Sequence, residues 1–263
     1  MLYNELDIPY HIEINGNCIP ILYDAENSEF YLYVSKLTNN REESVLCIKS
    51  FMEKFGITLV SCISEIDAPL YGAIGFKVRP CPETTECIYP IERFRSFSEV
   101  PSKRRLANQF FAAHPNYRCT EYSPTYESGC KMLLEMWEKQ KTSSSKEAEY
   151  NAGIREDVVL EKKILSDMGI MTYSGFVLLA ENAVIGFCFY EQLNENTVGL
   201  ISIKTDMRYR GAYQALIHLL AAHPVMASVR FLNYGNLSGV PGLANMKMQW
   251  KPSELLKFYE AEL

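Results

Sequence analysis

The sequence lacks long hydrophobic runs, and this excludes several classes of protein. None of its 263 residues lies in an apolar stretch approaching the roughly 20 residues that a membrane-spanning helix needs. The N-terminal residues have no basic start followed by an apolar segment, so no signal peptide is expected. We therefore expect a cytoplasmic protein that makes no integral membrane contact.

Closely spaced cysteines and an excess of basic charge are also missing. None of the eight cysteines forms a Cys-x-x-Cys pair, and the four histidines have no cysteine partner at zinc-finger spacing. We expect no metal site and no disulfide framework, and we expect Cys47, Cys62 and Cys188, in apolar runs, to be core residues. With 26 Lys+Arg against 32 Asp+Glu, the net charge of −6 argues against a DNA-binding protein but permits a local basic patch.

The first part of the chain reads as an α/β unit. Short apolar runs at 10–14, 18–23 and 29–34 predict strands, and Asn15-Gly16 between the first two is a strong hairpin signal. Apolar residues at helical spacing over 42–55 predict a helix that ends at Gly56, before a strand at 57–63. A further strand is expected near 87–91.

The rest of the chain repeats this alternation. Helices are expected near 132–140 and 147–168, strands at 175–180, 184–190 and 198–203, a helix at 211–222, a strand at 229–233 and a short helix after Pro252. This order resembles that of N-acyltransferases of the GNAT type. We predict two α/β (α+β) GNAT-like lobes, residues 1–98 and 99–263, each a mixed, mostly antiparallel sheet flanked by helices.

A basic segment joins the two predicted lobes. Six basic residues and two acidic ones lie between positions 89 and 118, and Lys103-Arg104-Arg105 opens a predicted helix. Arg104 and Asn108 share one face of that helix because they are four residues apart. These cations could bind phosphate or RNA, or they could form an ordinary solvated face.

Several motifs together resemble one known family. They are Pro101–Phe110, Tyr117–Trp137, Lys204-Thr-Asp206, Gly211-Ala-Tyr-Gln214, Phe231-Leu-Asn233, Gly239-Val-Pro-Gly-Leu243, Lys247 and Lys251-Pro252. The sequence thus resembles the uncharacterised family that includes the cytosolic C-terminal domain of phosphatidylglycerol lysyltransferase. The resemblance implies a tandem GNAT-like fold and, in membrane-anchored relatives, transfer of an aminoacyl group from charged tRNA to a lipid headgroup. It also marks Tyr213, Gln214, Asn233 and Lys247 as candidate substrate-binding residues.

The sequence departs from the family pattern at polar positions. Ile203 stands where the family has glutamate, Arg105 where it has asparagine, and Ala244-Asn245-Met246 where it has an arginine-rich segment. These losses favour an alternative in which the fold is kept and the chemistry is lost.

Arg208-x-x-Gly211-x-Tyr213 is close to the turn that holds the coenzyme A pyrophosphate in acetyltransferases. Such a turn needs glycine at a helix N-terminus, where free N–H groups face an anion. Tyr213 would crowd a pyrophosphate at this point. The other interpretation is that Gly211 begins a helix that packs against the core.

Three polar residues near strand ends are the candidate catalytic set. Glu191 could act as a general base toward an attacking amine, Lys204 could hold a phosphate or tRNA 3′ end, and Asp206 could orient Lys204. We expect the three to share a cleft. The alternatives are that Glu191 is a solvated acid at a strand end and that Lys204 and Asp206 form ordinary surface ion pairs.

The leading hypothesis is therefore an acyl or aminoacyl transferase. It would move an acyl group from a phosphate-bearing carrier, aminoacyl-tRNA or acyl-CoA, to an amine or hydroxyl acceptor, with no tightly bound cofactor. The alternative is a catalytically degenerate ligand- or RNA-binding module on the same fold.

Overall fold

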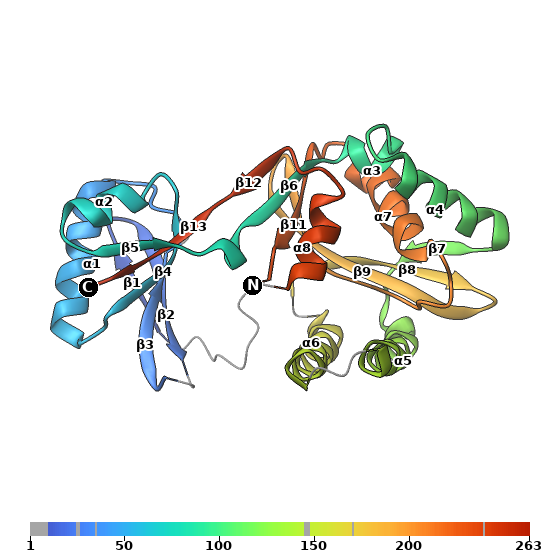
Figure 1. Ribbon diagram of the computed structural model, residues 1–263, viewed down its shortest axis with the longest axis horizontal. Coiled ribbons are helices and arrows are strands. Elements are labelled where there is room, and N and C mark those ends of the chain that lie inside the picture. Colours follow the sequence, from blue (N-terminus) through green and yellow to red (C-terminus); the bar gives the residue numbers. More distant parts are fainter. Residues whose placement is uncertain (1–9, 25–26, 35, 145–147, 170, 239) are drawn as a thin grey trace. The chain divides into compact units, whose positions relative to one another are not determined.

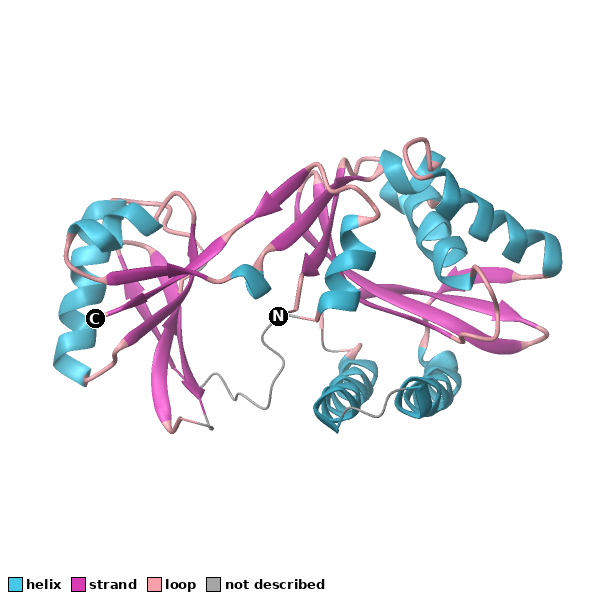
Figure 2. Cartoon of the chain, viewed as in Figure 1, coloured by secondary structure: helices cyan, strands magenta, loops and turns pink. Residues whose placement is uncertain are grey.

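Two β-sheets organise the protein, each flanked by helices (Figures 1 and 2). The computed structural model describes residues 10–24, 27–34, 36–144, 148–169, 171–238 and 240–263. One sheet has six strands and the other seven, and both mix parallel and antiparallel pairs. The predicted α/β class with two mixed sheets is confirmed.

The first compact unit takes in the chain up to Cys87 together with Asn236–Asn245 and Glu254–Leu263. Its sheet has the strand order β1-β2-β3-β4-β13-β5. The elements are β1 (Tyr10–Ile14), β2 (Asn17–Asp24), β3 (Glu29–Tyr33), α1 (Arg41–Phe55), β4 (Leu59–Ser64), α2 (Ala68–Ala73), β5 (Lys77–Pro80) and β13 (Phe258–Glu262).

Local sequence accounts for the start of this unit. Asn15 and Gly16 both have positive φ, 50° and 74°, so they form the predicted tight turn between β1 and β2. In α1, Val45, Ile48 and Met52 are buried against the sheet, as their helical spacing requires. Cys47 lies off this buried stripe and is exposed, so the prediction of a core role for it is wrong.

The C-terminal residues form strands, so the predicted helix after Pro252 is wrong. β12 (Glu254–Leu256) and β13 follow this proline, and β13 lies between β4 and β5, antiparallel to both. Ala261 of β13 is fully buried in the core of the first unit. The last strand of the chain therefore completes the first sheet, which a linear division at residue 98 does not describe.

The second compact unit comprises Ile88–Gly235 and Met246–Ser253. Its sheet has the order β12-β6-β11-β10-β9-β8-β7. The elements are β6 (Glu86–Pro90), α3 (Glu92–Ser96), α4 (Pro101–Ala113), β7 (Arg118–Glu121), α5 (Glu127–Ser144), α6 (Ala148–Asp167), β8 (Ser174–Ala180), β9 (Ala183–Asn194), β10 (Thr197–Thr205), α7 (Ala212–Ala222) and β11 (Phe231–Asn236). The division between the units falls within α8 (Pro241–Met248), after Asn245. Short 3₁₀ turns at Pro82–Thr84, Pro124–Tyr126 and Pro224–Met226 connect elements of the chain.

Helices cover both faces of the second sheet. In Figure 1, α5 and α6 lie together on one side of β8 and β9, and α4 and α7 lie on the other. Side chains alternate accordingly: Phe187 and Phe189 of β9 pack in the core formed with α5 and α6. Gly186, the residue before Phe187, faces Leu216 of α7.

The parallel strands β10 and β11 pair over a short length only. Thr197, Val198 and Gly199 pair with Phe231, Leu232 and Asn233, and no later residues of the two strands are partners. β10 nevertheless continues to Thr205 and β11 to Asn236. The two strands therefore separate at the end from which the chain leads into α7.

Candidate functional site

The three predicted catalytic residues lie at different places along the sheet. Lys204 of β10 is opposite Phe187 of β9, whereas Glu191 of β9 is opposite Gly199 of β10. Four residues of strand, about 13 Å, therefore separate Glu191 from Lys204. Asp206 follows the end of β10, where its N–H donates to the Ile185 carbonyl at 2.8 Å. The structure does not bring the three side chains into one cluster.

Lys204 is enclosed by acidic and aromatic groups. Its Nζ lies 2.9 Å from Asp157 Oδ2 and 3.1 Å from Glu161 Oε1 of α6, and 4.9 Å from the ring centroid of Trp137 in α5. Burial alone would lower the pKa of Lys204, but Glu161 and Asp157 outweigh it and hold the pKa above its usual value. Lys204 is thus protonated, and its ion pairs with the two carboxylates link β10 to α6 and balance its charge.

Glu161 is the least solvated member of this ion pair. Its side chain is 4% exposed, and burial raises its pKa, opposed by the neighbouring charge of Lys204. A hydrogen bond with the Ser202 side chain also opposes the effect of burial on this carboxyl. The pair is therefore sensitive to the loss of either member, because the remaining charge would stay buried.

Asp206 shapes the turn that leads from β10 into α7. It accepts hydrogen bonds from the Arg208 backbone N–H at 3.0 Å, from the Arg208 guanidinium, and from Gln140 of α5 at 2.9 Å. Burial acts to raise the pKa of Asp206, but these hydrogen bonds prevail and the pKa is lowered. Gln140 Oε1 also accepts from the Met207 N–H, so one side chain of α5 holds the first two residues of the turn. Asp206 orients Arg208 rather than Lys204.

Gly211 allows α4 to approach the start of α7. It has φ +86°, and a Cβ built at this position would lie 2.0 Å from the Leu106 carbonyl oxygen and 3.3 Å from Phe110 Cβ. A side chain here would collide with the backbone of α4. Helix packing therefore accounts for the glycine.

The basic helix α4 has a buried and an exposed face. Arg104, Arg105 and Asn108 are exposed, so Arg104 and Asn108 share the open face that their spacing predicts. Lys103 is buried: its Nζ donates to Gln249 Oε1 at 2.9 Å and lies 5.6 Å from the centroid of the Trp250 ring.

Two of the predicted substrate-binding residues, Tyr213 and Lys247, lie against Tyr234, near the point where β10 and β11 separate. The hydroxyl of Tyr213 in α7 contacts the hydroxyl of Tyr234 in β11, and the Met246 sulfur lies 3.7 Å from it. Lys247 Nζ lies 5.7 Å from the Tyr234 ring centroid, and the Lys247 carbonyl accepts a hydrogen bond from Tyr89 at 2.8 Å. Burial raises the pKa of Tyr213, so its hydroxyl keeps its proton. Gln214 beside it is half-buried.

Asn233 and Glu191 occupy one row of the sheet on either side of Gly199. Gly199 pairs with Glu191 on one side and with Asn233 on the other, so the two side chains project from the same face. Asn233 is buried and its Oδ1 accepts from the Gly235 N–H at 2.9 Å. Glu191 is half-buried, and Leu193 packs over the glycine. This row lies at the last paired residues of β10 and β11.

The sequence analysis missed four contributors. Tyr234 completes the tyrosine contact, and Asp157, Glu161 and Gln140 hold Lys204 and the β10–α7 turn. The i, i+4 spacing of Asp157 and Glu161 placed both carboxylates on one helix face. No local signal indicated that this face meets Lys204, since the contact joins residues more than 40 positions apart.

Other features of the described residues do not add to the site. No disulfide joins any of the eight cysteines, all of which lie in the described part of the chain, and Cys62 and Cys188 are buried as predicted. No group of three or more metal-ligating side chains occurs in the described part of the chain. Among the helices that are described, none has the length and apolar composition to cross a membrane.

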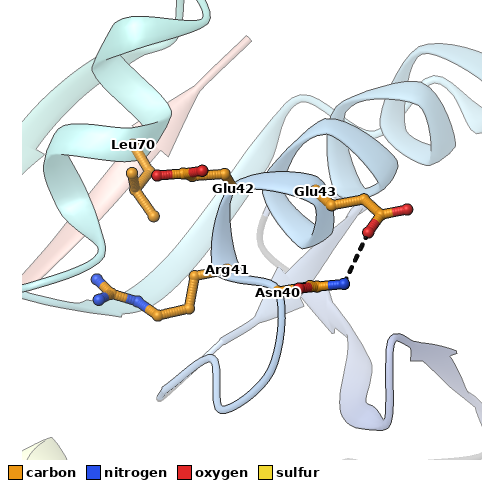
Figure 3. A pocket seen from close by; sticks show the side chains of 5 residues that line it. All are labelled: Asn40, Arg41, Glu42, Glu43 and Leu70. Atoms are coloured by element: carbon orange, nitrogen blue, oxygen red, sulfur yellow. Dashed lines mark hydrogen bonds between the residues drawn. The ribbon is translucent and has the colours of Figure 1, made fainter.

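One pocket of about 250 Å³ lies in the first unit (Figure 3). It is lined by Asn40, Arg41, Glu42 and Glu43 at the start of α1 and by Leu70 of α2. Asn40 donates to Glu43 at 3.0 Å, and Arg41 is engaged by Asp67 at 2.5 Å. None of the predicted site residues lines it, so it lies apart from the residues discussed above.

Comparisons with known proteins place this geometry in context. A conserved protein of unknown function from Bacteroides thetaiotaomicron VPI-5482 superimposes with a TM-score of 0.82 at 19% identity, over 96% of this chain and 85% of that one. L-PGS from Bacillus licheniformis gives 0.66 at 14% identity, covering 93% and 80%. A tandem GNAT protein from the clavulanic acid biosynthesis pathway gives 0.51 at 12% identity, covering 95% and 81%. No curated protein sequence matches this chain.

At these identities the structural neighbours establish the fold, which is the GNAT-like arrangement of two mixed sheets flanked by helices. Sequence similarity extends further. The sequence model of the family described as "Phosphatidylglycerol lysyltransferase, C-terminal" matches residues 40–262, which is most of the chain. The protein therefore belongs to the phosphatidylglycerol lysyltransferase C-terminal family.

Proposed function

We propose that the protein is an acyl or aminoacyl transferase that moves an acyl group from a phosphate-bearing carrier to an amine or hydroxyl acceptor. Family membership gives the general kind of reaction. The observation that carries the proposal is the separation of β10 and β11 after Gly199 and Asn233. Separated strands leave backbone N–H and C=O groups free to bind an extended acyl donor.

The residues around this opening have separate roles in the proposed reaction. The acceptor nitrogen or oxygen attacks the donor carbonyl carbon, and Glu191 takes the proton from the acceptor. The C–O or C–S bond to the carrier then breaks, and Glu191 returns that proton to the departing oxygen or sulfur, which leaves as a hydroxyl or thiol. Asn233, in the same row as Glu191, is the candidate substrate-binding residue nearest to it along the sheet. Tyr213, Gln214 and Lys247 line the neighbouring surface between α7 and β11.

Contact with the donor phosphate is assigned to the exposed face of α4. Arg104 and Asn108 are exposed there, whereas Lys204 is occupied by two carboxylates. Because Gly211 packs against α4, a charged tRNA fits this arrangement better than the pyrophosphate of coenzyme A.

One observation favours a second candidate, a non-catalytic binding module. The Tyr213 hydroxyl contacts Tyr234, so a side-chain bridge joins α7 to β11 beside the separated strands. A degenerate protein in which tyrosines fill the donor channel would show this contact.

Thermal shift with acetyl-CoA, CoA, bulk tRNA and charged Lys- or Ala-tRNA tests the donor. A ligand at a hundred times its Kd stabilises the folded state by about 2.7 kcal/mol, which the assay detects readily. We expect a shift with tRNA that weakens with salt and in Arg104→Ala. A shift with coenzyme A alone would contradict the assignment of the donor, and no shift with any of them would favour the binding module.

Single-turnover transfer from the donor that binds tests the base. Glu191→Gln is expected to lower the rate by about a hundredfold or more, with donor binding unchanged. The matched control is Glu195→Gln, which removes the same charge from an exposed residue in the turn of the same hairpin. Equal rates for the two variants would remove Glu191 from the mechanism.

A further inference from the structure

Buried cations surround Trp250 in the second unit. Arg93 and Lys103 are each 8% exposed, and Trp250 is fully buried. A guanidinium N of Arg93 lies 3.5 Å from the Trp250 carbonyl oxygen, and Lys103 Nζ lies over the indole ring. Two positive charges are thus buried beside one tryptophan, Arg93 at its carbonyl and Lys103 at its indole ring, where α3, α4 and the segment after α8 come together.

Hydrogen-bond donors exceed acceptors at this place. The Arg93 Nε–H and the Trp250 indole N–H are buried and have no partner in the part of the chain that the structure describes. A buried donor without an acceptor costs about 1–3 kcal/mol, so two of them beside buried cations call for an additional acceptor. An anion supplies both the charge and the acceptor oxygens.

The groups that now contact these cations belong to exposed side chains. Glu99, 54% exposed, accepts from Arg93 at 2.9 Å, and the exposed Gln249 accepts from Lys103 at 2.9 Å. No carboxylate pairs with Lys103 among the described residues, and burial lowers the pKa of its ammonium. Both contacting side chains lie at the surface and can rotate away, whereas the cations cannot.

We propose that Arg93, Lys103 and Trp250 form a binding site for a small oxyanion of the phosphate class, which enters by displacing Glu99 and Gln249. The phosphate can be free or part of a larger carrier. The site is independent of the transferase proposal, because none of its three residues takes part in the proposed reaction.

Saturable stabilisation by inorganic phosphate at constant ionic strength tests the proposal, with acetate and a nucleoside 5′-monophosphate as parallel arms. We expect phosphate to raise Tm saturably and to change Trp250 fluorescence in a Trp137→Phe background, since these are the only two tryptophans. Tighter binding of the nucleotide would identify a carrier phosphate, and equal binding a free one. Acetate binding as tight as phosphate, or no saturable response, would overturn the proposal.

Variants locate the response. Lys103→Met, which keeps the length and burial of the side chain, is expected to weaken phosphate binding by about tenfold or more. Glu99→Gln is expected to tighten phosphate binding because it removes the carboxylate that competes for Arg93. Gln249→Ala is expected to tighten it as well, because it removes the amide that competes for Lys103 and leaves both cations in the sequence.

The matched control is Glu92→Gln, which alters net charge equally. Glu92 is 65% exposed and lies 3.7 Å from Arg95, a different cation. Equal tightening in Glu92→Gln and Glu99→Gln would reduce the effect to general electrostatics and refute the site. Unchanged binding in Lys103→Met, with its fold verified by circular dichroism, would refute it as well.

Discussion

Replacing Gly211 by alanine tests whether α4 packs directly on the turn before α7. The new Cβ would lie 2.0 Å from the Leu106 carbonyl oxygen and 2.7 Å from its carbon, in a backbone with φ +86°. The left-handed conformation costs alanine about 1–2 kcal/mol. Displacing a helix backbone adds about 1–3 kcal/mol. We expect Gly211→Ala to lower the free energy of unfolding by about 2–5 kcal/mol, a large part of the 5–15 kcal/mol typical of a folded protein.

Urea unfolding followed by tryptophan fluorescence measures this loss in the unit concerned, because Trp137 and Trp250 both belong to the second unit. Gly235→Ala is the matched control. Gly235 also has positive φ, +72°, but the nearest atom to its Cβ is the flexible end of Lys247 at 3.6 Å. Gly235→Ala should therefore lose only the free energy due to the left-handed conformation, about 1–2 kcal/mol. Equal losses in the two variants would refute close packing of α4 on Gly211.

Two further predictions concern the buried charges of the second unit. Lys204→Met should destabilise by about 3–5 kcal/mol, because it leaves Glu161 buried without its partner. Lys162→Met is the control: it breaks an exposed ion pair with Glu135 at 3.1 Å and should lower the free energy of unfolding by under about 1 kcal/mol. Similar urea midpoints for the two variants would contradict a stabilising ion pair between Lys204 and Glu161. The lowered pKa of Asp206 contributes stability that is present above its ordinary value near 4 and is lost as pH falls through the folded pKa. The free energy of unfolding should therefore fall less steeply with decreasing pH for Asp206→Asn than for the unaltered protein. Superimposable curves would show that the Arg208 hydrogen bonds do not stabilise this carboxylate.

Local sequence patterns determined most of the secondary structure. The Asn15-Gly16 turn and the apolar spacing of α1 follow from nearest-neighbour preferences that act in any context. The motifs around Gly211 and Lys247 were sufficient to indicate the family, which the match over residues 40–262 confirms. The same motifs selected Tyr213 and Lys247, and both of these residues lie against Tyr234 in the structure.

Only the tertiary structure decided where the polar side chains act. Lys204 could be assigned to a phosphate from its strand-end position, but Asp157 and Glu161 neutralise it across 40 or more intervening residues. The strand at Phe258–Glu262 depends on pairing with β4 and β5, which lie about 200 and about 180 residues earlier and supply the hydrogen-bond partners that a short terminal segment lacks. From the sequence, Gly211 could be required either for anion binding or for close helix packing. The Leu106 carbonyl next to it shows that close packing of α4 requires a glycine there. Such contacts join residues that are distant in the chain, so periodicity and local propensity carry no record of them.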